Sequence, residues 1–186
     1  RNSDIITLLL QNGADINFRN NNGDTPLHYA VDSGNSDIIK LLLDSGADIN
    51  LQNNNGDTPL HYAVSSAKID IIQLLLGNGA DIDLKNYQGE SPLHYAIDNY
   101  HEHIVQLLIS SGADINLKNY NGETPLHKSV LSRNKSIIKL LLDSGADINI
   151  LDTEGNTPIH LALCNRRYDI IKYLIIRGAD ISENTY

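Results

Sequence analysis

The sequence predicts an all-α solenoid, a stack of short helical repeats, and two recurring phrases lead to this fold class. One phrase is Thr-Pro-Leu-His or a close variant, and the other is Gly-Ala-Asp-Ile; both return every 33 residues. The first begins at Thr25, Thr58, Ser91, Thr124 and Thr157, and the second at Gly13, Gly46, Gly79, Gly112, Gly145 and Gly178. A fixed period of this length is the sequence signature of a repeat array, whose core lies between neighbouring units.

A turn and a first helix open each repeat. In the first full repeat, the Asn/Asp/Gly composition of residues 20–24 indicates a turn. Thr25 can then cap a helix with its side-chain oxygen, and Pro26 suits the first helical position because its missing N–H costs nothing there. We therefore predict a helix from Pro26 to about Ser33.

A second helix follows in each repeat. Residues 38–43 place isoleucine and leucine side chains with the one-sided spacing of an amphipathic helix. Gly46 is expected to end this helix in the left-handed conformation, which glycine adopts without strain. The next residues, 48–51, lead into the following repeat as an extended arm, and paired arms predict hairpins beside the helices.

The turn between the two helices varies along the chain. Gly34 occupies one position of this turn in the first full repeat, and its counterparts are Ala67, Tyr100, Arg133 and Arg166. One alternative is that the position has a positive φ, at a cost of about 1 kcal/mol for each residue that is not glycine. The other is a slightly different turn in the later repeats.

The repeats follow one another without insertions and predict a single repeat domain over residues 1–186. Residues 1–19 form a half repeat, and full repeats are expected at 20–52, 53–85, 86–118, 119–151 and 152–186. A lone helix within residues 1–19 would leave its apolar side uncovered, so we expect the sequence to be a fragment of a longer chain.

The two phrases at this period resemble the ankyrin repeat over essentially the whole sequence. The resemblance implies L-shaped units, each with two helices and a β-hairpin tip. It also implies that the tips and the first helices line a concave groove that binds other proteins. The histidine of each Thr-Pro-Leu-His phrase would then bond to the threonine of its own motif and to nearby backbone.

The composition narrows the class of partner. The net charge is −9, and nucleic acids or anionic membranes need clustered cations, so we expect neither as a partner. A single cysteine, Cys164, cannot form an internal disulfide, and no apolar run approaches the about 20 residues that span a bilayer. These features favour an intracellular protein, cytoplasmic or nuclear. The heavy use of Asn and Ile resembles ankyrin-rich proteins of large DNA viruses and intracellular bacteria, which would place it in a host cytoplasm.

Candidate chemistry is sparse. Five of the seven histidines recur once per repeat, which favours a structural role because a catalytic group occurs once per site. His101 and His103 are two residues apart, so in a helix they point away from each other, and a zinc site needs three or four ligands. Cys164 near Arg166 has the alternatives of a reactive thiol and an ordinary small side chain. We predict no enzyme, no cofactor and no metal site.

The positions that change between repeats are where a partner could be selected. At the tips and on the first helices, we predict partner-binding residues Tyr87, Tyr120, Glu90, Glu123, Asp98, Leu131, Asp57 and Asn99. The tyrosines are the expected anchors, because exposed aromatics often dominate interfaces. The alternatives are that the tyrosines only cover backbone, and that the carboxylates stabilise helix N-termini.

The function predicted is therefore non-enzymatic protein binding by a monomer. Two alternatives stay open: the substrate-recognition part of a larger enzyme or ubiquitin-ligase-type adaptor, and a structural spacer. Repeat 119–151 also departs from the pattern, because Lys128 replaces a tyrosine and Ser129 an alanine. Such departures are candidates for function.

Overall fold

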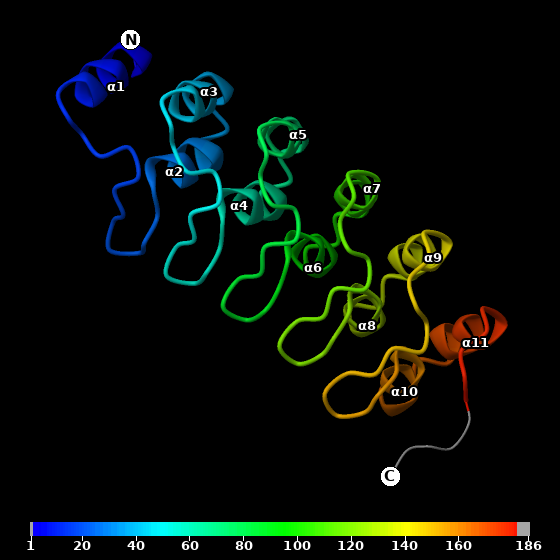
Figure 1. Cartoon of the computed structure of the whole chain (residues 1–186). Helices are drawn as coiled ribbons and strands as arrows, with labels where there is room; N and C mark the ends of the chain where they lie inside the picture. The colour runs from blue at the N-terminus through cyan, green and yellow to red at the C-terminus, as the bar shows by residue number, and fades with distance from the viewer. Residues whose placement is uncertain (1, 182–186) are drawn as a thin grey trace. The chain divides into compact units, whose positions relative to one another are not determined.

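The computed structural model describes residues 2–181, which contain eleven helices and no strand (Figure 1). They form two compact units, which divide between Tyr87 and Gln88. The first unit contains α1 (Asn2–Gln11), α2 (Pro26–Ser33), α3 (Ser36–Asp44), α4 (Pro59–Ser65) and α5 (Ile69–Gly77). The second contains α6 (Pro92–Asp98), α7 (Glu102–Ser110), α8 (Pro125–Leu131), α9 (Lys135–Asp143), α10 (Pro158–Cys164) and α11 (Tyr168–Ile176).

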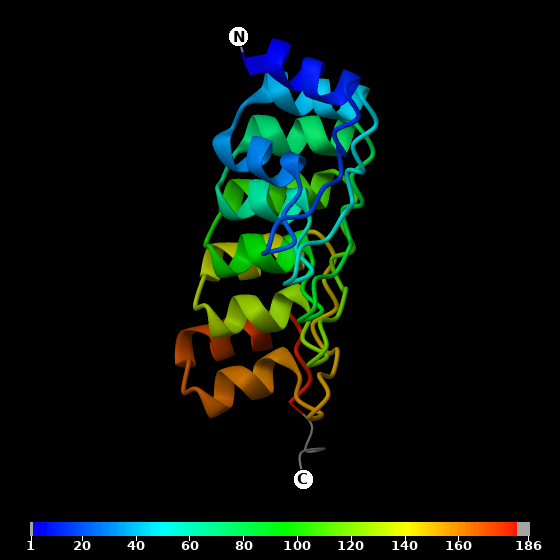
Figure 2. The same cartoon turned by 90° about the vertical axis from the view of Figure 1, so that its left-hand side faces the viewer.

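Each unit has two layers of helices. The helices that begin with the Thr-Pro or Ser-Pro phrase, here called the first helices, are α2 and α4 in one unit and α6, α8 and α10 in the other. Within each unit they pack against one another, and each also packs against the second helix that follows it. In each unit the long loops that connect one repeat to the next run along one side of the helices (Figure 2).

The helix starts follow the predicted capping chemistry in part, because the prolines take the predicted position but Thr25 makes no side-chain cap hydrogen bond. The helix predicted from Pro26 to about Ser33 is α2, with its proline at the first position. At α4, the Thr58 hydroxyl oxygen accepts a hydrogen bond from the backbone N–H of His61 at 3.4 Å. The second helix α3 is capped by Asn35, whose Oδ1 accepts from the N–H of Ile38 at 3.1 Å. These caps satisfy backbone donors that the first turn leaves without a helical partner.

The varied turn between the helices has a positive φ in every full repeat. Gly34 has a φ of 72°, and the other residues at this position also adopt the left-handed region. Their φ values are 53° for Ala67, 59° for Tyr100, 61° for Arg133 and 53° for Arg166. The first alternative from the sequence is therefore confirmed, and four residues with a side chain accept a strained conformation. Gly46 likewise ends its helix with a φ of 89°, as predicted.

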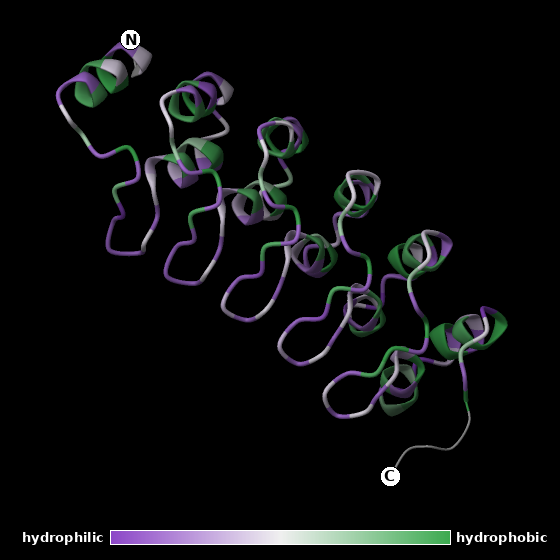
Figure 3. Cartoon of the chain, viewed as in Figure 1, coloured by the Kyte–Doolittle hydropathy of each residue, from purple (hydrophilic) through white to green (hydrophobic). Residues whose placement is uncertain are grey.

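The core consists of small aliphatic side chains between the helices. Leu27, Val31 and Ile39 are fully buried in the first unit, and Leu126 and Ile138 are fully buried in the second. Figure 3 shows apolar residues concentrated on the helices and polar residues along most of the loops. Helices of seven to ten residues are not stable alone, so this packing is what holds them.

The hairpins predicted at the tips are hydrogen-bonded turns, and residues 2–181 contain no strand. Gly23 N–H donates to the Asn20 carbonyl at 2.9 Å, and Asn20 N–H donates to the Asp24 carbonyl at 3.0 Å. The side chain of Asn20 also accepts from the N–H of Asp24 at 2.9 Å. Neighbouring tips are joined by single backbone bonds, such as Asn54 N–H to the Asn22 carbonyl at 2.9 Å. Isolated bonds of this kind do not make a ladder, so a strand does not form.

Candidate functional site

The two tip tyrosines are exposed and held by their backbone. Tyr87 is 59% exposed and Tyr120 is 65% exposed. Tyr87 N–H donates to the Asn55 carbonyl at 3.0 Å, and the Tyr87 ring lies beside Gly56, where an added Cβ would come within 2.6 Å of the ring carbon Cδ1. Tyr120 lies against Gly89 in the same way. Each ring therefore covers tip backbone on one side and remains largely exposed.

Three more predicted residues lie at the ends of first helices in the second unit. Asp98 and Asn99 are exposed at the end of α6, and Leu131, the last residue of α8, is 40% exposed. The side chain of Asn99 donates to the Tyr95 carbonyl at 2.9 Å, which leaves its oxygen on the surface. These positions are accessible to a partner, and their role in binding stays a prediction.

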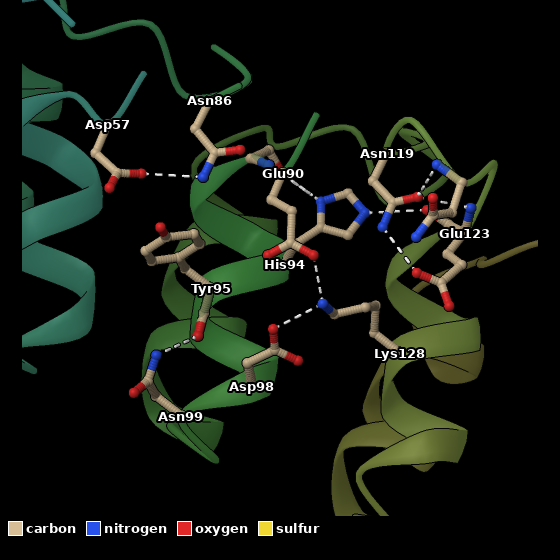
Figure 4. Close-up of polar contacts among 12 residues, drawn as sticks. Asp57, Asn86, Glu90, His94, Tyr95, Asp98, Asn99, Asn119, Glu123 and Lys128 are labelled. Carbon is tan, nitrogen blue, oxygen red and sulfur yellow. Dashed lines mark hydrogen bonds and ion pairs between the residues drawn. The ribbon is translucent and has the colours of Figure 1, made fainter. Parts of the chain in front are cut away.

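The predicted carboxylates at the tips serve the fold itself. Asp57 is only 7% exposed, and its Oδ1 accepts from Asn86 Nδ2 at 3.0 Å. Glu123 is partly buried and accepts from Asn119 Nδ2 at 2.8 Å. Figure 4 shows both contacts. These side-chain hydrogen bonds differ from the helix-dipole stabilisation considered as an alternative. One joins Asp57 to an asparagine of the neighbouring tip, and the other joins Glu123 to an asparagine of its own tip.

Glu90 belongs to a cluster of charges around Lys128. The Lys128 ammonium forms ion pairs with a carboxylate oxygen of Glu90 and, at 2.7 Å, with Oδ2 of Asp98 (Figure 4). The Lys128 side chain is only 13% exposed. Burial alone lowers the pKa of Lys128, but the hydrogen bonds to Asp98 and Glu90 raise that pKa overall. Burial and the neighbouring carboxylates raise the pKa of Asp98, against the opposing effect of Lys128.

Lys128 was absent from the predicted binding residues, although its replacement of a repeat tyrosine was a visible signal in the sequence. In the first unit the corresponding residue is Tyr62, whose hydroxyl donates to Asp24 Oδ1 at 2.8 Å. Burial and this bond raise the pKa of Tyr62 to about 12. The lysine thus takes over a contact between repeats that a tyrosine makes elsewhere, and it adds a positive charge.

The motif histidines have the role that the resemblance implied. The backbone N–H of Thr25 donates to His28 Nδ1 at 3.1 Å, so the proton is on Nε2, which lies 3.1 Å from the Asp57 carbonyl oxygen and donates to it. His94 has the same arrangement with Ser91 and the Glu123 carbonyl. Each such histidine joins its own helix start to the next tip.

The other candidate groups are placed at helix ends. His101 is the N-cap residue of α7, and His103 is exposed in its first turn. Among residues 2–181, no group of three or more His, Cys, Asp or Glu side chains is arranged to hold a metal ion. Cys164 is exposed at the end of α10. None of the described helices combines the length and the hydrophobicity that a membrane span requires.

The helix pairs, tip turns and histidine links define a class of protein built from stacked helical repeats. A family model described as ankyrin repeats (3 copies) matches residues 1–86, 42–119, 70–152 and 93–185. The chain therefore belongs to the ankyrin-repeat family. A comparison with curated proteins finds no match. Ankyrin repeats are generally modules for protein–protein interaction.

Proposed function

We propose that this chain is a non-enzymatic module that binds a partner protein through its tips and the exposed ends of its first helices. The observation that carries the proposal is the exposure of Tyr87 and Tyr120, 59% and 65%, on tips whose backbone is fixed by hydrogen bonds. Exposed aromatic rings offer a large contact area to a partner, and an aromatic side chain held in place loses little entropy on binding.

The remaining predicted residues divide into contacts and supports. Asp98, Asn99 and Leu131 are exposed and would contact the partner, and Asp98 does so while its carboxylate also pairs with Lys128. Asp57, Glu90 and Glu123 are engaged within the fold, so we propose that they position the tips and do not touch the partner. This division follows from their burial and hydrogen bonds.

Two other functions remain as alternatives to a free-standing binding module. In the first, the chain is the substrate-recognition part of a larger enzyme or adaptor, and the same surface would bind the substrate. In the second, it is a structural spacer with no selective partner. The experiment below separates the spacer from both binding functions.

The test is a crosslinking pull-down followed by affinity measurement with each captured protein after purification. The variant Tyr87→Ala/Tyr120→Ala/Leu131→Ala is compared with the unaltered chain. A control, Tyr168→Ala/Ile176→Ala, removes side chains on α11 that are 75% and 71% exposed. Circular dichroism checks that all three proteins are folded.

We expect the control to bind as the unaltered chain does and the triple variant to bind at least about tenfold more weakly, because truncating an aromatic anchor commonly costs more than 1 kcal/mol. Equal binding by the triple variant would exclude the tip surface. No selective capture by the unaltered chain would favour the spacer.

A further inference from the structure

The charge cluster around Lys128 has a counterpart in the first unit, where no cation of the described residues pairs with the two carboxylates. Lys68 lies close by, but its ammonium donates to the backbone carbonyls of Val31 and Asp32. Glu90, Asp98 and Lys128 lie two repeats, or 66 residues, after Asp24, Asp32 and Tyr62. The acids occupy the same tip and first-helix positions in both units, with Asp24 in place of Glu90, and a tyrosine stands in place of the lysine. Two carboxylates that hold an ammonium in one unit therefore have counterparts in the other that pair with no cation of the described residues.

A pocket lies at this place in the first unit. Its volume is about 210 Å³, and it is lined by Asp24, His28, Tyr29, Asp32 and Tyr62. Each of these residues is the counterpart, two repeats earlier, of a residue in or beside the Lys128 cluster. A water molecule takes up about 30 Å³ of liquid, so the pocket has room for an ammonium group and the end of its alkyl chain.

The carboxylates of the pocket have unused capacity to accept hydrogen bonds. Asp24 is 8% exposed, and its Oδ1 accepts from Tyr62 at 2.8 Å and from Asn53 at 2.9 Å. Its other oxygen, Oδ2, accepts none from the described residues. The side chain of Asp32 is exposed and has no hydrogen bond or ion pair with the described residues.

The rings that complete the pocket also suit a cation. Tyr62 packs edge-on against His28, with ring centroids 5.2 Å apart, and Tyr29 is 57% exposed at the pocket. Aromatic faces attract ammonium groups, and their low polarity strengthens a charge pair by excluding water. The burial of the Lys128 ammonium between two carboxylates shows that this chain uses the same chemistry internally.

We propose that the pocket between Asp24 and Asp32 binds the ammonium group of a lysine side chain from a partner protein. This proposal rests on the proposed function and adds a chemical class of ligand to it. Lys128 closes the corresponding position of the second unit from within, so the two units differ in selectivity. A lysine of the partner would be recognised in the first unit alone.

The test uses blocked amino acids as probes, so it does not depend on finding a partner. N-acetyl-lysine N-methylamide is titrated into the full chain at low salt, and NMR follows the ring signals of Tyr62 and His28. N-acetyl-norleucine N-methylamide, which lacks the ammonium, is the matched probe. We expect saturable shifts with the lysine compound only. Equal shifts with both compounds would overturn the proposal.

Two variants test the carboxylate. Asp32→Asn should weaken binding of the lysine probe by about tenfold, as expected for loss of a charge-assisted hydrogen bond. Asp37→Asn removes the same charge from another exposed position, on α3, and should leave the affinity within about twofold. An equal loss in both variants would mean that the probe responds to net charge, and the pocket would be rejected.

Two exchanges test the correspondence between the units. Tyr62→Lys should fill the pocket from within and abolish the shifts, while circular dichroism shows that the chain is folded. Lys128→Tyr should open a second site and add saturable shifts at His94. If Lys128→Tyr is folded and gains no site, or Tyr62→Lys still binds the probe, the inference is wrong. Loss of lysine binding would leave the tyrosine surface untouched, so the two proposals fail independently.

Discussion

At the scale of single residues, the motif histidines His28, His94 and His127 work as neutral hydrogen-bonding groups. His94 is fully buried between its own helix start and the Glu123 carbonyl. Burial lowers the pKa of His94 from 6.5 to about 4, and the bond to the Glu123 carbonyl opposes this only in part. Burial also lowers the pKa values of His28 and His127. A protonated ring would lose the acceptor at Nδ1 that the helix start requires.

This burial predicts a loss of stability in weak acid. In the unfolded chain His94 has a pKa of 6.5, so below this pH it binds a proton that it does not bind in the folded chain. The free energy of unfolding therefore falls as the pH drops toward 4. From pH 7 to pH 5 the share of His94 is about 2 kcal/mol. Urea unfolding at both pH values measures it, with His94→Gln as the comparison. The variant should have a smaller pH dependence, and an unchanged dependence would contradict the prediction.

The burial of individual side chains could not be predicted from the sequence. The tip acids vary between Asp and Glu and precede a helix, which is the pattern of an exposed, partner-selecting column. Asp57 is nevertheless buried, because Asn86 on the next tip donates to it. The closeness of Asp98 and Lys128, 30 positions apart, likewise arises only when two repeats stack. The sequence shows that Lys128 departs from the repeat pattern, but it does not show that Lys128 pairs with Glu90 and Asp98.

At the scale of the element, the helices were predictable because their limits are set by local chemistry. Threonine caps, N1 prolines and the terminal glycines determine where a helix starts and ends, and α2 covers the predicted range. The conformation of the tips was less predictable, because the formation of strands by two arms depends on pairing with neighbouring repeats. The turn between helices left two alternatives, since Ala67 or Arg133 gives no sign of the left-handed φ that both adopt.

That turn predicts different effects for two adjacent glycine substitutions. Ala67 has a φ of 53°, and Ser66 has a φ of −86°. Ala67→Gly relieves about 1 kcal/mol of strain, which offsets the greater freedom that glycine gives the unfolded chain. Ser66→Gly relieves no strain and only increases the freedom of the unfolded chain, so it should destabilise the fold by about 0.5–1 kcal/mol. Urea unfolding should place Ala67→Gly about 1 kcal/mol above Ser66→Gly. Equal stabilities would mean that the turn stores no strain.

At the scale of the whole molecule, charge sets the balance between folding and binding. The chain has 23 acidic and 14 basic residues, which gives it a net charge of −9. Excess like charge opposes the compact state and attracts cationic partners over a Debye length. The same excess therefore weakens the fold and strengthens the proposed recognition of lysine.

Salt should consequently act in opposite directions on the two properties. Raising NaCl from about 20 to about 150 mM shortens the Debye length to about 8 Å and screens repulsion among the acids, so the urea midpoint should rise. Over the same range the affinity for N-acetyl-lysine N-methylamide should fall severalfold, because its attraction is electrostatic. The two measurements use one protein and one salt series, with sucrose at equal osmolality as the uncharged control. A urea midpoint that falls with NaCl would mean that local pairs such as Lys128 with Asp98 outweigh the net charge of −9.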